Sequence, residues 1–360
     1  MNTHKKKVLI DLSVLKHPYC GLGQIALNYI RIINSTDTDA LPFRIVLLVP
    51  SHYFGCCGNK VDYVPRQRIY KFMPWLYPKV DVWHAIHQLS PFMPYSTHTQ
   101  YLLTIHDFNF MYEKEGRVAQ QYHTRIQKRI NRAQYIACIS DFTRSELIKY
   151  MTLPKDTPVK VIYNGVEFPD KDAQVPTPDF TALSNNKSFF FSIGEVKEKK
   201  NFLTIVRMMQ YFPDKHLYIA GKNSTPYADI INNYIRKNNI TNVTLTGIVN
   251  NNERLWLYQH CEAFLFPSLF EGFGLPVIEA MALGKPVFCS SETSLSEIGG
   301  DCACFFTSFE PEQMALCVRN NIETLMQPEQ MNRRISYAHT FDYDKHFNQY
   351  FRVYTSLTNQ

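Results

Sequence analysis

The sequence predicts an α/β fold made of two doubly wound, Rossmann-like domains. Short apolar runs of strand length alternate with segments that repeat apolar residues at helical spacing, first over residues 8–163 and again over residues 189–289. A stretch rich in Pro, Asp, Thr and Ser, residues 168–186, separates the two series and is expected to be a linker. At 360 residues the chain is long enough for two domains that each bury a core.

The first domain is expected to span residues 1–170. Strands are predicted at residues 8–13, 43–49, 80–86, 101–106, 135–140 and 159–163, and helices at residues 24–33, 116–132 and 142–150. Strands that alternate with helices in this way form a parallel sheet. Its ligands are expected beyond the carboxyl ends of the strands.

The second domain is expected to span residues 187–340 and to repeat the same architecture without a repeated sequence. Strands are predicted at residues 189–193, 216–220, 243–247, 263–266 and 286–289, and helices at residues 202–211, 228–237, 253–261 and 276–283. We therefore expect a second parallel sheet with its own ligand edge.

The stretch from Pro267 to Ser290 organises the second domain. An apolar strand stops at Pro267, two glycines follow, and Pro276 stands where a first helical residue would. Gly284 is placed to end that helix. The predicted unit is strand, loop, helix, strand, and the free amides and positive dipole end at such a helix start favour a negatively charged group such as phosphate.

Two carboxylates frame this helix start. Glu271 lies on the loop and Glu279, eight positions later, is expected in the first turn of the helix. Carboxylates repel phosphate but accept hydrogen bonds from vicinal hydroxyls, so the pattern suits a ligand that carries both, as a nucleotide sugar does. The alternative is that Glu279 only complements the helix dipole and Glu271 is a solvated loop acid.

The spacing of these glutamates in EGFGLPVIE, with PS before it and EAMALGKPV after it, resembles the signature of the retaining family 4 glycosyltransferases of the GT-B fold. The resemblance implies two domains facing across a cleft, with a C-terminal helix, residues 345–360, that crosses back to the first domain. It implies His106, Lys200 and Glu271 as catalytic residues, and a donor site that includes Gly21, Gly23, Gly194, Lys199, Gly272, Phe273, Gly274, Leu275, Glu279 and Glu297.

The loop GEVKEKKN, residues 194–201, follows the first strand of the second domain. A lysine there can neutralise a diphosphate and help it depart; the alternative is a solvated lysine cluster. A glycine followed six residues later by Lys-Asn resembles the family's donor-phosphate motif, which points to Lys200. Many members carry arginine directly after that glycine, whereas this chain has Glu195, and Lys199 is the candidate to compensate.

Two motifs of the first domain can also be compared with the motifs of this family. Gly21, Gly23 and Ala26 form G-x-G-x-x-A, but the glycines come about seven residues after the strand and the next strand ends without an acid for a ribose, which argues against a dinucleotide site. TIHDFNF resembles the family's T-x-H-D motif and places His106 at a strand end. There it can contact a sugar hydroxyl or cap the strand.

No cofactor and no metal are expected beyond the nucleotide-sugar substrate. His84 and His87 have a spacing compatible with metal binding but lack acidic or cysteine partners nearby, so structural roles are favoured. Asp342 and Asp344 form a D-x-D pattern that precedes an aromatic helical segment, which favours a helix start over a metal site.

The composition limits which ligands the protein binds and in which cellular compartment it works. The net charge of +6 suits anionic ligands or an anionic membrane surface and does not require nucleic acid. Nine scattered cysteines do not form a disulfide framework, which favours a cytoplasmic protein. No run approaches the length of a membrane span. Residues 66–79 interleave bases with aromatics, a pattern found at lipid headgroups and oligosaccharides, and a solvated loop is the alternative.

The sequence therefore predicts a retaining, metal-independent transferase that moves a hexose, with mannose the first candidate, to a glycan or lipid-linked saccharide in surface polysaccharide assembly. The expected location is cytoplasmic, with peripheral contact at the inner face of the cell membrane. Two other functions remain open: a sugar-nucleotide epimerase of related fold and a non-catalytic nucleotide-sugar-binding protein.

Overall fold

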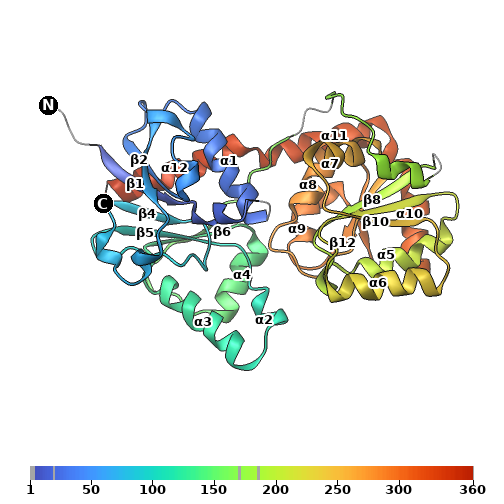
Figure 1. The fold of residues 1–360 in the computed structure, drawn as a ribbon, viewed down its shortest axis with the longest axis horizontal. Coiled ribbons are helices and arrows are strands. Elements are labelled where there is room, and N and C mark those ends of the chain that lie inside the picture. Colours follow the sequence, from blue (N-terminus) through green and yellow to red (C-terminus); the bar gives the residue numbers. More distant parts are fainter. Residues whose placement is uncertain (1–4, 19–20, 169–171, 185–186, 360) are drawn as a thin grey trace. The chain divides into compact units, whose positions relative to one another are not determined.

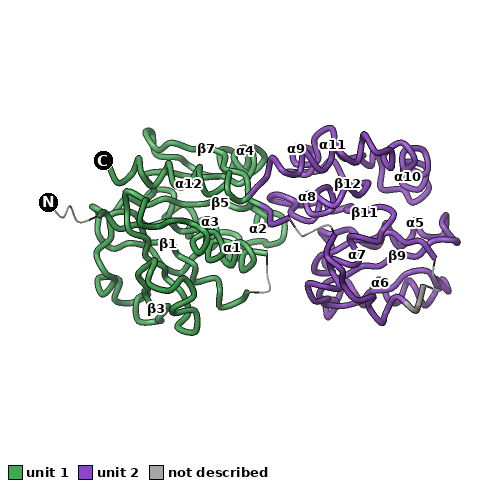
Figure 2. Tube along the Cα trace, turned by 90° about the horizontal axis from the view of Figure 1, so that it is seen from above, with its two compact units in different colours: residues 1–165, 343–360 green, residues 166–342 purple. Residues whose placement is uncertain are grey.

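A computed structural model describes residues 5–18, 21–168, 172–184 and 187–359. The chain divides into two compact units (Figures 1 and 2). Unit 1 comprises residues 1–165 and 343–360, and unit 2 comprises residues 166–342. Residues 169–171 and 185–186 of the predicted linker lie outside the described residues.

Unit 1 contains a seven-stranded parallel sheet with the order β3-β2-β1-β4-β5-β6-β7. Its strands are β1 Lys6–Asp11, β2 Phe43–Val49, β3 Asp62–Pro65, β4 Val82–Ala85, β5 Gln100–Ile105, β6 Tyr135–Cys138 and β7 Val159–Val161. Strand β3 is absent from the sequence prediction, because its four residues DYVP mix polar and apolar side chains and end in proline.

Helices cover both faces of this sheet (Figure 1). They are α1 Gly21–Ser35, α2 Phe110–Glu113, α3 Gly116–Ile130, α4 Asp141–Tyr150 and α12 Tyr343–Thr358. Successive residues of β1 point to opposite faces, so Val8 and Ile10 pack in the core that includes α1 and α12, while Leu9 packs in the core that includes α3 and α4. Both faces are apolar, as a doubly wound sheet requires.

The last helix, α12, belongs to unit 1 although it is the end of the chain (Figure 2). Phe347 of α12 packs edge-on against Tyr29 of α1 at 4.4 Å between ring centroids. Tyr354 holds the buried His84 ring through a 2.7 Å hydrogen bond. The predicted return of the C-terminal helix to the first domain is confirmed, and its aromatic residues are the reason that it packs there.

Unit 2 contains a six-stranded parallel sheet with the order β10-β9-β8-β11-β12-β13. Its strands are β8 Phe189–Ile193, β9 His216–Ala220, β10 Val243–Gly247, β11 Ala263–Phe266, β12 Val287–Ser290 and β13 Cys304–Phe306. Its helices are α5 Phe202–Met208, α6 Pro226–Lys237, α7 Asn251–His260, α8 Leu275–Ala282, α9 Leu295–Gly299, α10 Pro311–Met326 and α11 Pro328–Ala338. The predicted pair of doubly wound sheets is therefore present.

In each sheet the strand that comes first in the sequence, β1 or β8, lies in the interior of the sheet. The chain adds strands on one side of it and then on the other. In unit 2 the chain runs from β8 outward to β9 and β10, then crosses to the other side of β8 and continues through β11, β12 and β13. Loops that leave β8 and β11 therefore diverge at the carboxyl edge, where ligands of such sheets bind. Among the described residues, no helix combines the length and apolar character that crossing a membrane requires.

Candidate active site

The two loops that the sequence singled out leave neighbouring strands of unit 2. Residues 194–201 follow β8, and residues 267–274 follow β11, which pairs with β8 in parallel. Two hydrogen bonds to one carbonyl join the loops: the Leu269 amide donates to the Lys199 carbonyl at 2.7 Å, and the Ser268 hydroxyl donates to the same oxygen at 3.1 Å. The switch point of this sheet is therefore built by both loops.

Lys200 and Glu271 meet at this point. The Lys200 ammonium pairs with the Glu271 carboxylate, and the two side chains are only 14% and 15% exposed. Lys200 also lies over the Phe266 ring, 4.9 Å from its centroid. A Cβ atom on Gly194 would approach the Lys200 side chain to 3.2 Å, and φ at Gly194 is +152°. The glycine therefore leaves room for the lysine to reach the loop after β11.

The start of α8 lies next to this ion pair in sequence. Gly274 precedes Leu275, the first residue of the helix, with φ of +113°, and a Cβ there would come within 2.7 Å of Leu295. Gly272, Phe273 and Gly274 form the end of the loop that leads into the helix at Leu275, and the positive dipole end of the helix favours a bound anion there. Gly284 follows the helix with φ of +72°, as the sequence predicted.

Glu279 is held by α7. Its carboxylate accepts a 2.9 Å hydrogen bond from the Tyr258 hydroxyl and lies 3.4 Å from an Arg254 guanidinium nitrogen. This carboxylate raises the pKa of Arg254, while burial raises the pKa of Tyr258. The sequence prediction that Glu279 lies in the first turn is wrong: α8 begins at Leu275, so Glu279 is its fifth residue. The helix start is therefore less shielded by acid than expected.

Residues 293–297 brace the loop after β11 from the side of β12. The Glu271 amide donates to the Thr293 hydroxyl at 3.0 Å, and the Ser294 hydroxyl donates to the carbonyls of Glu271 and Phe273 at 2.9 Å each. Glu297 follows in the first turn of α9 and is half-buried. The structure thus places Glu297 one short turn from the segment that orients Glu271.

Glu195 is engaged by two lysines. Its carboxylate lies 2.7 Å from the Lys197 ammonium and 3.9 Å from the Lys222 ammonium. Lys222 follows β9, whose Ala220 carbonyl accepts from the Gly194 amide at 2.9 Å. The acid therefore draws a cation from the neighbouring strand to the same edge, which sequence reasoning about Lys199 did not anticipate.

His106 follows β5 in unit 1 and is 6% exposed. Its Nε2 lies 2.7 Å from the Ile86 carbonyl, an acceptor only, so Nε2 carries the proton and donates. Burial lowers the pKa of His106 to about 4. The ring is therefore neutral at neutral pH and has Nδ1 as a hydrogen-bond acceptor. The Asp107 carboxylate fixes the following turn by accepting from the Asn109 amide at 3.0 Å.

Gly21 and Gly23 lie inside α1 and not in a loop before it, so the predicted start of that helix at Gln24 is wrong. A Cβ on Gly23 would come within 2.3 Å of the His17 carbonyl oxygen, whereas one on Gly21 would meet nothing within 4 Å. Gly23 is thus required by a close approach of the chain to itself, which the G-x-G pattern alone does not distinguish from ligand approach.

Two of the residues that resembled metal ligands, His84 and Asp344, have structural placements. His84 is fully buried, and its two ring nitrogens bond the Tyr354 and Thr104 hydroxyls at 2.7 and 2.8 Å. Asp344 lies in the first turn of α12. Over the described part of the chain, no group of three or more His, Cys, Asp or Glu side chains is arranged to hold a metal ion.

Sequence reasoning missed Arg254, Tyr258 and Ser294. Arg254 and Tyr258 are four residues apart on α7, a spacing that puts them on one face, but nothing in the sequence connects that face to α8. Ser294 stands 23 positions from Glu271, whose carbonyl it contacts. All three contact α8 or the loop before it, and only the tertiary structure brings those segments near.

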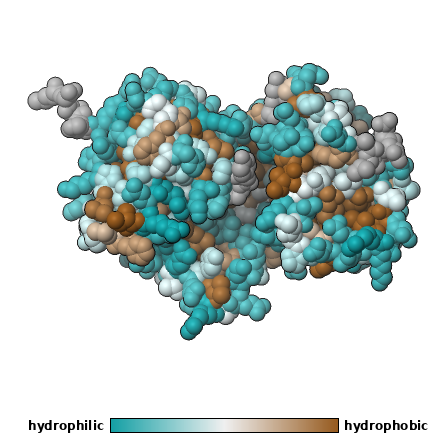
Figure 3. All heavy atoms as spheres, viewed as in Figure 1, coloured by the Kyte–Doolittle hydropathy of each residue, from teal (hydrophilic) through white to brown (hydrophobic). Residues whose placement is uncertain are grey.

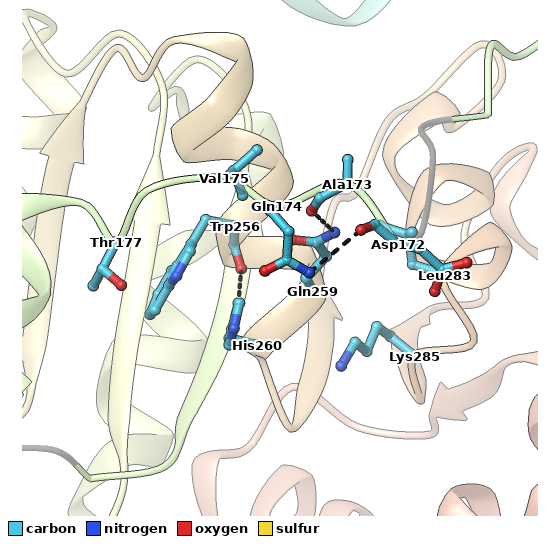
Figure 4. A pocket seen from close by; sticks show the side chains of 10 residues that line it. All are labelled: Asp172, Ala173, Gln174, Val175, Thr177, Trp256, Gln259, His260, Leu283 and Lys285. Carbon is cyan, nitrogen blue, oxygen red and sulfur yellow. Dashed lines mark hydrogen bonds between the residues drawn. The ribbon is translucent and has the colours of Figure 1, made fainter.

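A cavity of about 500 Å³ lies elsewhere in unit 2 (Figure 4). Its walls include Gln259 and His260 from the end of α7, and Lys285 from the turn before β12. These residues precede β11 and β12, so the cavity is at the amino edge of the sheet, away from the loops described above. It contains none of the predicted site residues.

Comparisons with known proteins relate the chain to glycosyltransferases. Residues 177–340 match the family model described as Glycosyl transferases group 1, and residues 30–168 match the model described as Glycosyltransferase Family 4. O-antigen chain mannosyltransferase RfbU of Salmonella typhimurium is 23% identical over 355 residues, covering 94% of this chain and 96% of that protein. O-antigen chain mannosyltransferase B of Escherichia coli is 26% identical over 327 residues, covering 82% and 85%.

Solved structures show the same fold. Sucrose-phosphate synthase from Thermosynechococcus elongatus superposes with a TM-score of 0.71 at 16% identity, covering 98% of this chain and 99% of that one. HepE of Anabaena, solved with UDP and glucose, superposes with a TM-score of 0.67 at 18% identity, covering 98% and 100%. The predicted GT-B fold is confirmed.

Proposed function

Since this chain is a glycosyltransferase of the GT-B fold, with a family 4 first half and a group 1 second half, we propose that it transfers a hexose from a nucleotide-diphosphate sugar to a glycan acceptor. Mannose is the proposed sugar, and a hydroxyl of a glycan or lipid-linked saccharide in surface polysaccharide assembly is the proposed acceptor. The names of the two O-antigen mannosyltransferases that match most of the chain support this choice.

The Lys200–Glu271 pair is the observation that carries the proposal. It joins a cation suited to diphosphate and an acid suited to sugar hydroxyls at the switch point of one sheet. In the proposed complex Lys200 turns to the diphosphate, Glu271 binds the sugar, and the amides from Gly272 to Leu275 hold the phosphates. Glu279, already held by Tyr258, receives the ribose hydroxyls.

The proposed chemistry retains the anomeric configuration and uses no metal. The bond between the anomeric carbon and the diphosphate oxygen breaks as a bond to the acceptor oxygen forms on the same face. The acceptor proton passes to the departing diphosphate, whose negative charge Lys200 and the α8 amides stabilise. No pair of carboxylates is assigned as nucleophile and acid. His106 is proposed to accept a hydrogen bond from the sugar through Nδ1.

The donor and the reaction class can be tested together. The protein is incubated with GDP-mannose, UDP-glucose and UDP-N-acetylglucosamine, with and without a lipid-linked saccharide acceptor, and free nucleotide and sugar products are measured. Release that requires acceptor and is fastest with GDP-mannose supports the proposal. A rearranged nucleotide sugar formed without acceptor would identify an epimerase instead, and binding without either product would identify a binding protein.

Retention of configuration and metal independence are tested separately. The anomeric configuration of the product, read by NMR from the coupling at the anomeric carbon, is expected to match that of the donor; the opposite configuration overturns retention. Turnover is expected to persist after EDTA treatment, and loss that Mg²⁺ or Mn²⁺ restores overturns metal independence.

The proposed location is the cytoplasm, at the inner face of the cell membrane. The eight described cysteines are all free thiols, which agrees with a reducing compartment. A lipid-linked acceptor would require the enzyme to work at a membrane surface. Fractionation of cells that express the protein is expected to divide it between the soluble and membrane fractions, with the membrane share released by salt.

A further inference from the structure

A ridge of exposed apolar side chains projects from unit 1 between β3 and β4. Here the ridge means residues 68–76, which form two short 3-10 helices, Arg68–Lys71 and Pro74–Leu76. Its large apolar side chains are unusually open: Phe72 is 78% exposed, Trp75 55%, Leu76 47% and Ile69 44%. Figure 3 shows apolar patches of this kind on the surface of unit 1. Single exposed apolar residues are common on protein surfaces, but several that are adjacent mark an interaction site.

The ridge is held in place by its own aromatic anchors. Tyr70 stacks on the buried Tyr77 at 4.1 Å between ring centroids, and Tyr77 packs edge-on against the buried Trp83 at 4.8 Å. The amides of Phe72 and Met73 both donate to the Ile69 carbonyl, at 2.9 and 2.8 Å. Because side chains three apart eclipse in a 3-10 turn, Ile69 and Phe72 project to the same side. The fold therefore supports an outward-facing apolar surface.

The charge around the ridge has one sign. Residues 66–80 contain four cations, Arg66, Arg68, Lys71 and Lys79, and no acid. Across the described residues, no ion pair or side-chain hydrogen bond engages the charged groups of Arg68, Lys71 or Lys79, all of which are exposed. Trp75 lies against Tyr95, itself 65% exposed, with 6.1 Å between ring centroids. Bases beside exposed Trp, Tyr and Phe match the chemistry of an anionic lipid headgroup region above acyl chains.

We propose that the ridge is the membrane-contact surface of the protein, with Phe72 and Trp75 entering the interface of an anionic bilayer and Arg68 and Lys71 pairing with lipid phosphates. Sugar-binding platforms offer flat rings among polar groups, whereas this ridge adds the aliphatic Ile69 and Leu76, which favours lipid. The proposal rests on the proposed function for its purpose, since it brings the enzyme to a lipid-linked acceptor. Its test does not use turnover, so either can fail alone.

Trp75 supplies the probe. The chain has three tryptophans, and Trp75 is the most exposed of them: Trp83 is 1% exposed, and Trp256 is half-buried and stacked between Phe189 and His260. The full chain is mixed with phosphatidylcholine vesicles that contain none or about one third phosphatidylglycerol. With the anionic vesicles we expect a blue shift of the emission and quenching by lipids brominated near the headgroup. Both signals should vanish in Trp75→Phe, which retains binding.

Variants separate the two contributions. By co-sedimentation, Arg68→Gln with Lys71→Gln is expected to weaken vesicle binding about 25-fold, since each interfacial base contributes about fivefold. Phe72→Ser is expected to weaken it roughly tenfold or more. Ile148→Ser is the matched control: Ile148 is 61% exposed on α4 of the same unit, and its loss should leave binding unchanged. Thermal unfolding of each variant verifies the fold.

Three results would overturn the proposal. The first is equal vesicle binding by wild type and by Phe72→Ser. The second is a Trp75 shift on addition of a soluble oligosaccharide but not of vesicles, which would make the ridge a glycan platform. The third is concentration-dependent self-association in sedimentation velocity that Phe72→Ser abolishes, with no vesicle binding, which would make it an interface between two copies of the chain.

Discussion

Replacing Lys200 by methionine should damage both catalysis and stability, and the structure allows the two effects to be separated. Lys200 and Glu271 form an ion pair whose side chains are about one-seventh exposed. Removing one member of a fully buried pair costs about 3–5 kcal/mol, and this partial exposure reduces the expected loss in unfolding free energy to roughly 2 kcal/mol. Removing a cation from a departing diphosphate should lower kcat by about 10²–10³-fold.

The chain offers a matched control at the opposite edge of the same sheet. Lys215 and Glu262 lie 2.6 Å apart with side chains 20% and 18% exposed, just before β9 and β11 begin. Lys215→Met should therefore cost a similar roughly 2 kcal/mol. Because it is remote from the carboxyl edge, kcat should stay within about twofold of wild type. Equal stability loss with unequal catalytic loss would assign Lys200 to the reaction.

The assay pairs urea unfolding with acceptor-dependent nucleotide release at saturating donor, at a temperature where both variants remain folded. The reasoning is refuted if Lys200→Met retains kcat within about threefold of wild type, or if Lys215→Met loses as much activity. Glu271→Gln completes the set. It keeps the shape and a hydrogen bond to Lys200 but removes the counter-charge, so a large fall in kcat is expected with a loss of stability no greater than that of Lys200→Met.

Three further outcomes are expected. Tyr258→Phe removes the 2.9 Å hydrogen bond that holds Glu279, so KM for the donor should rise about fivefold with kcat little changed; an unchanged KM would contradict a ribose role. Burial lowers the pKa of His346 from 6.5 to about 4, so the unfolded chain binds a proton that the folded chain does not. The free energy of unfolding therefore falls as the pH drops through that window, and the share of His346 is about 2 kcal/mol at pH near 5. Burial also lowers the pKa values of His84, His87, His106 and His216, so His346→Gln should reduce this pH dependence, measured by urea unfolding, by its own share only. Gly23→Ala should cost roughly 2–3 kcal/mol because its Cβ would lie 2.3 Å from a carbonyl oxygen, whereas Gly21→Ala, with open space, should not lower the thermal midpoint.

The alternation of strands and helices, the carboxyl-edge loops and a helix that begins close to Pro276 are all local in origin. Apolar period, glycine and proline position and strand length are properties of a few consecutive residues, so the sequence by itself predicts them. For the same reason the candidate residues Lys200, Glu271 and Glu279 could be named before any coordinates. Strand β3 and the true start of α1 were not predicted, because their local sequence signals are weak or ambiguous.

Contacts between distant segments were decided only by the tertiary structure. Lys200 and Glu271 are 71 positions apart and meet because β11 pairs with β8, an order that the chain's own periodicity does not encode. The partners of Glu279 on α7 depend in the same way on how helices pack over the sheet. Local pattern fixes which residues leave a strand end, but strand order and side-chain packing determine which of them share a site.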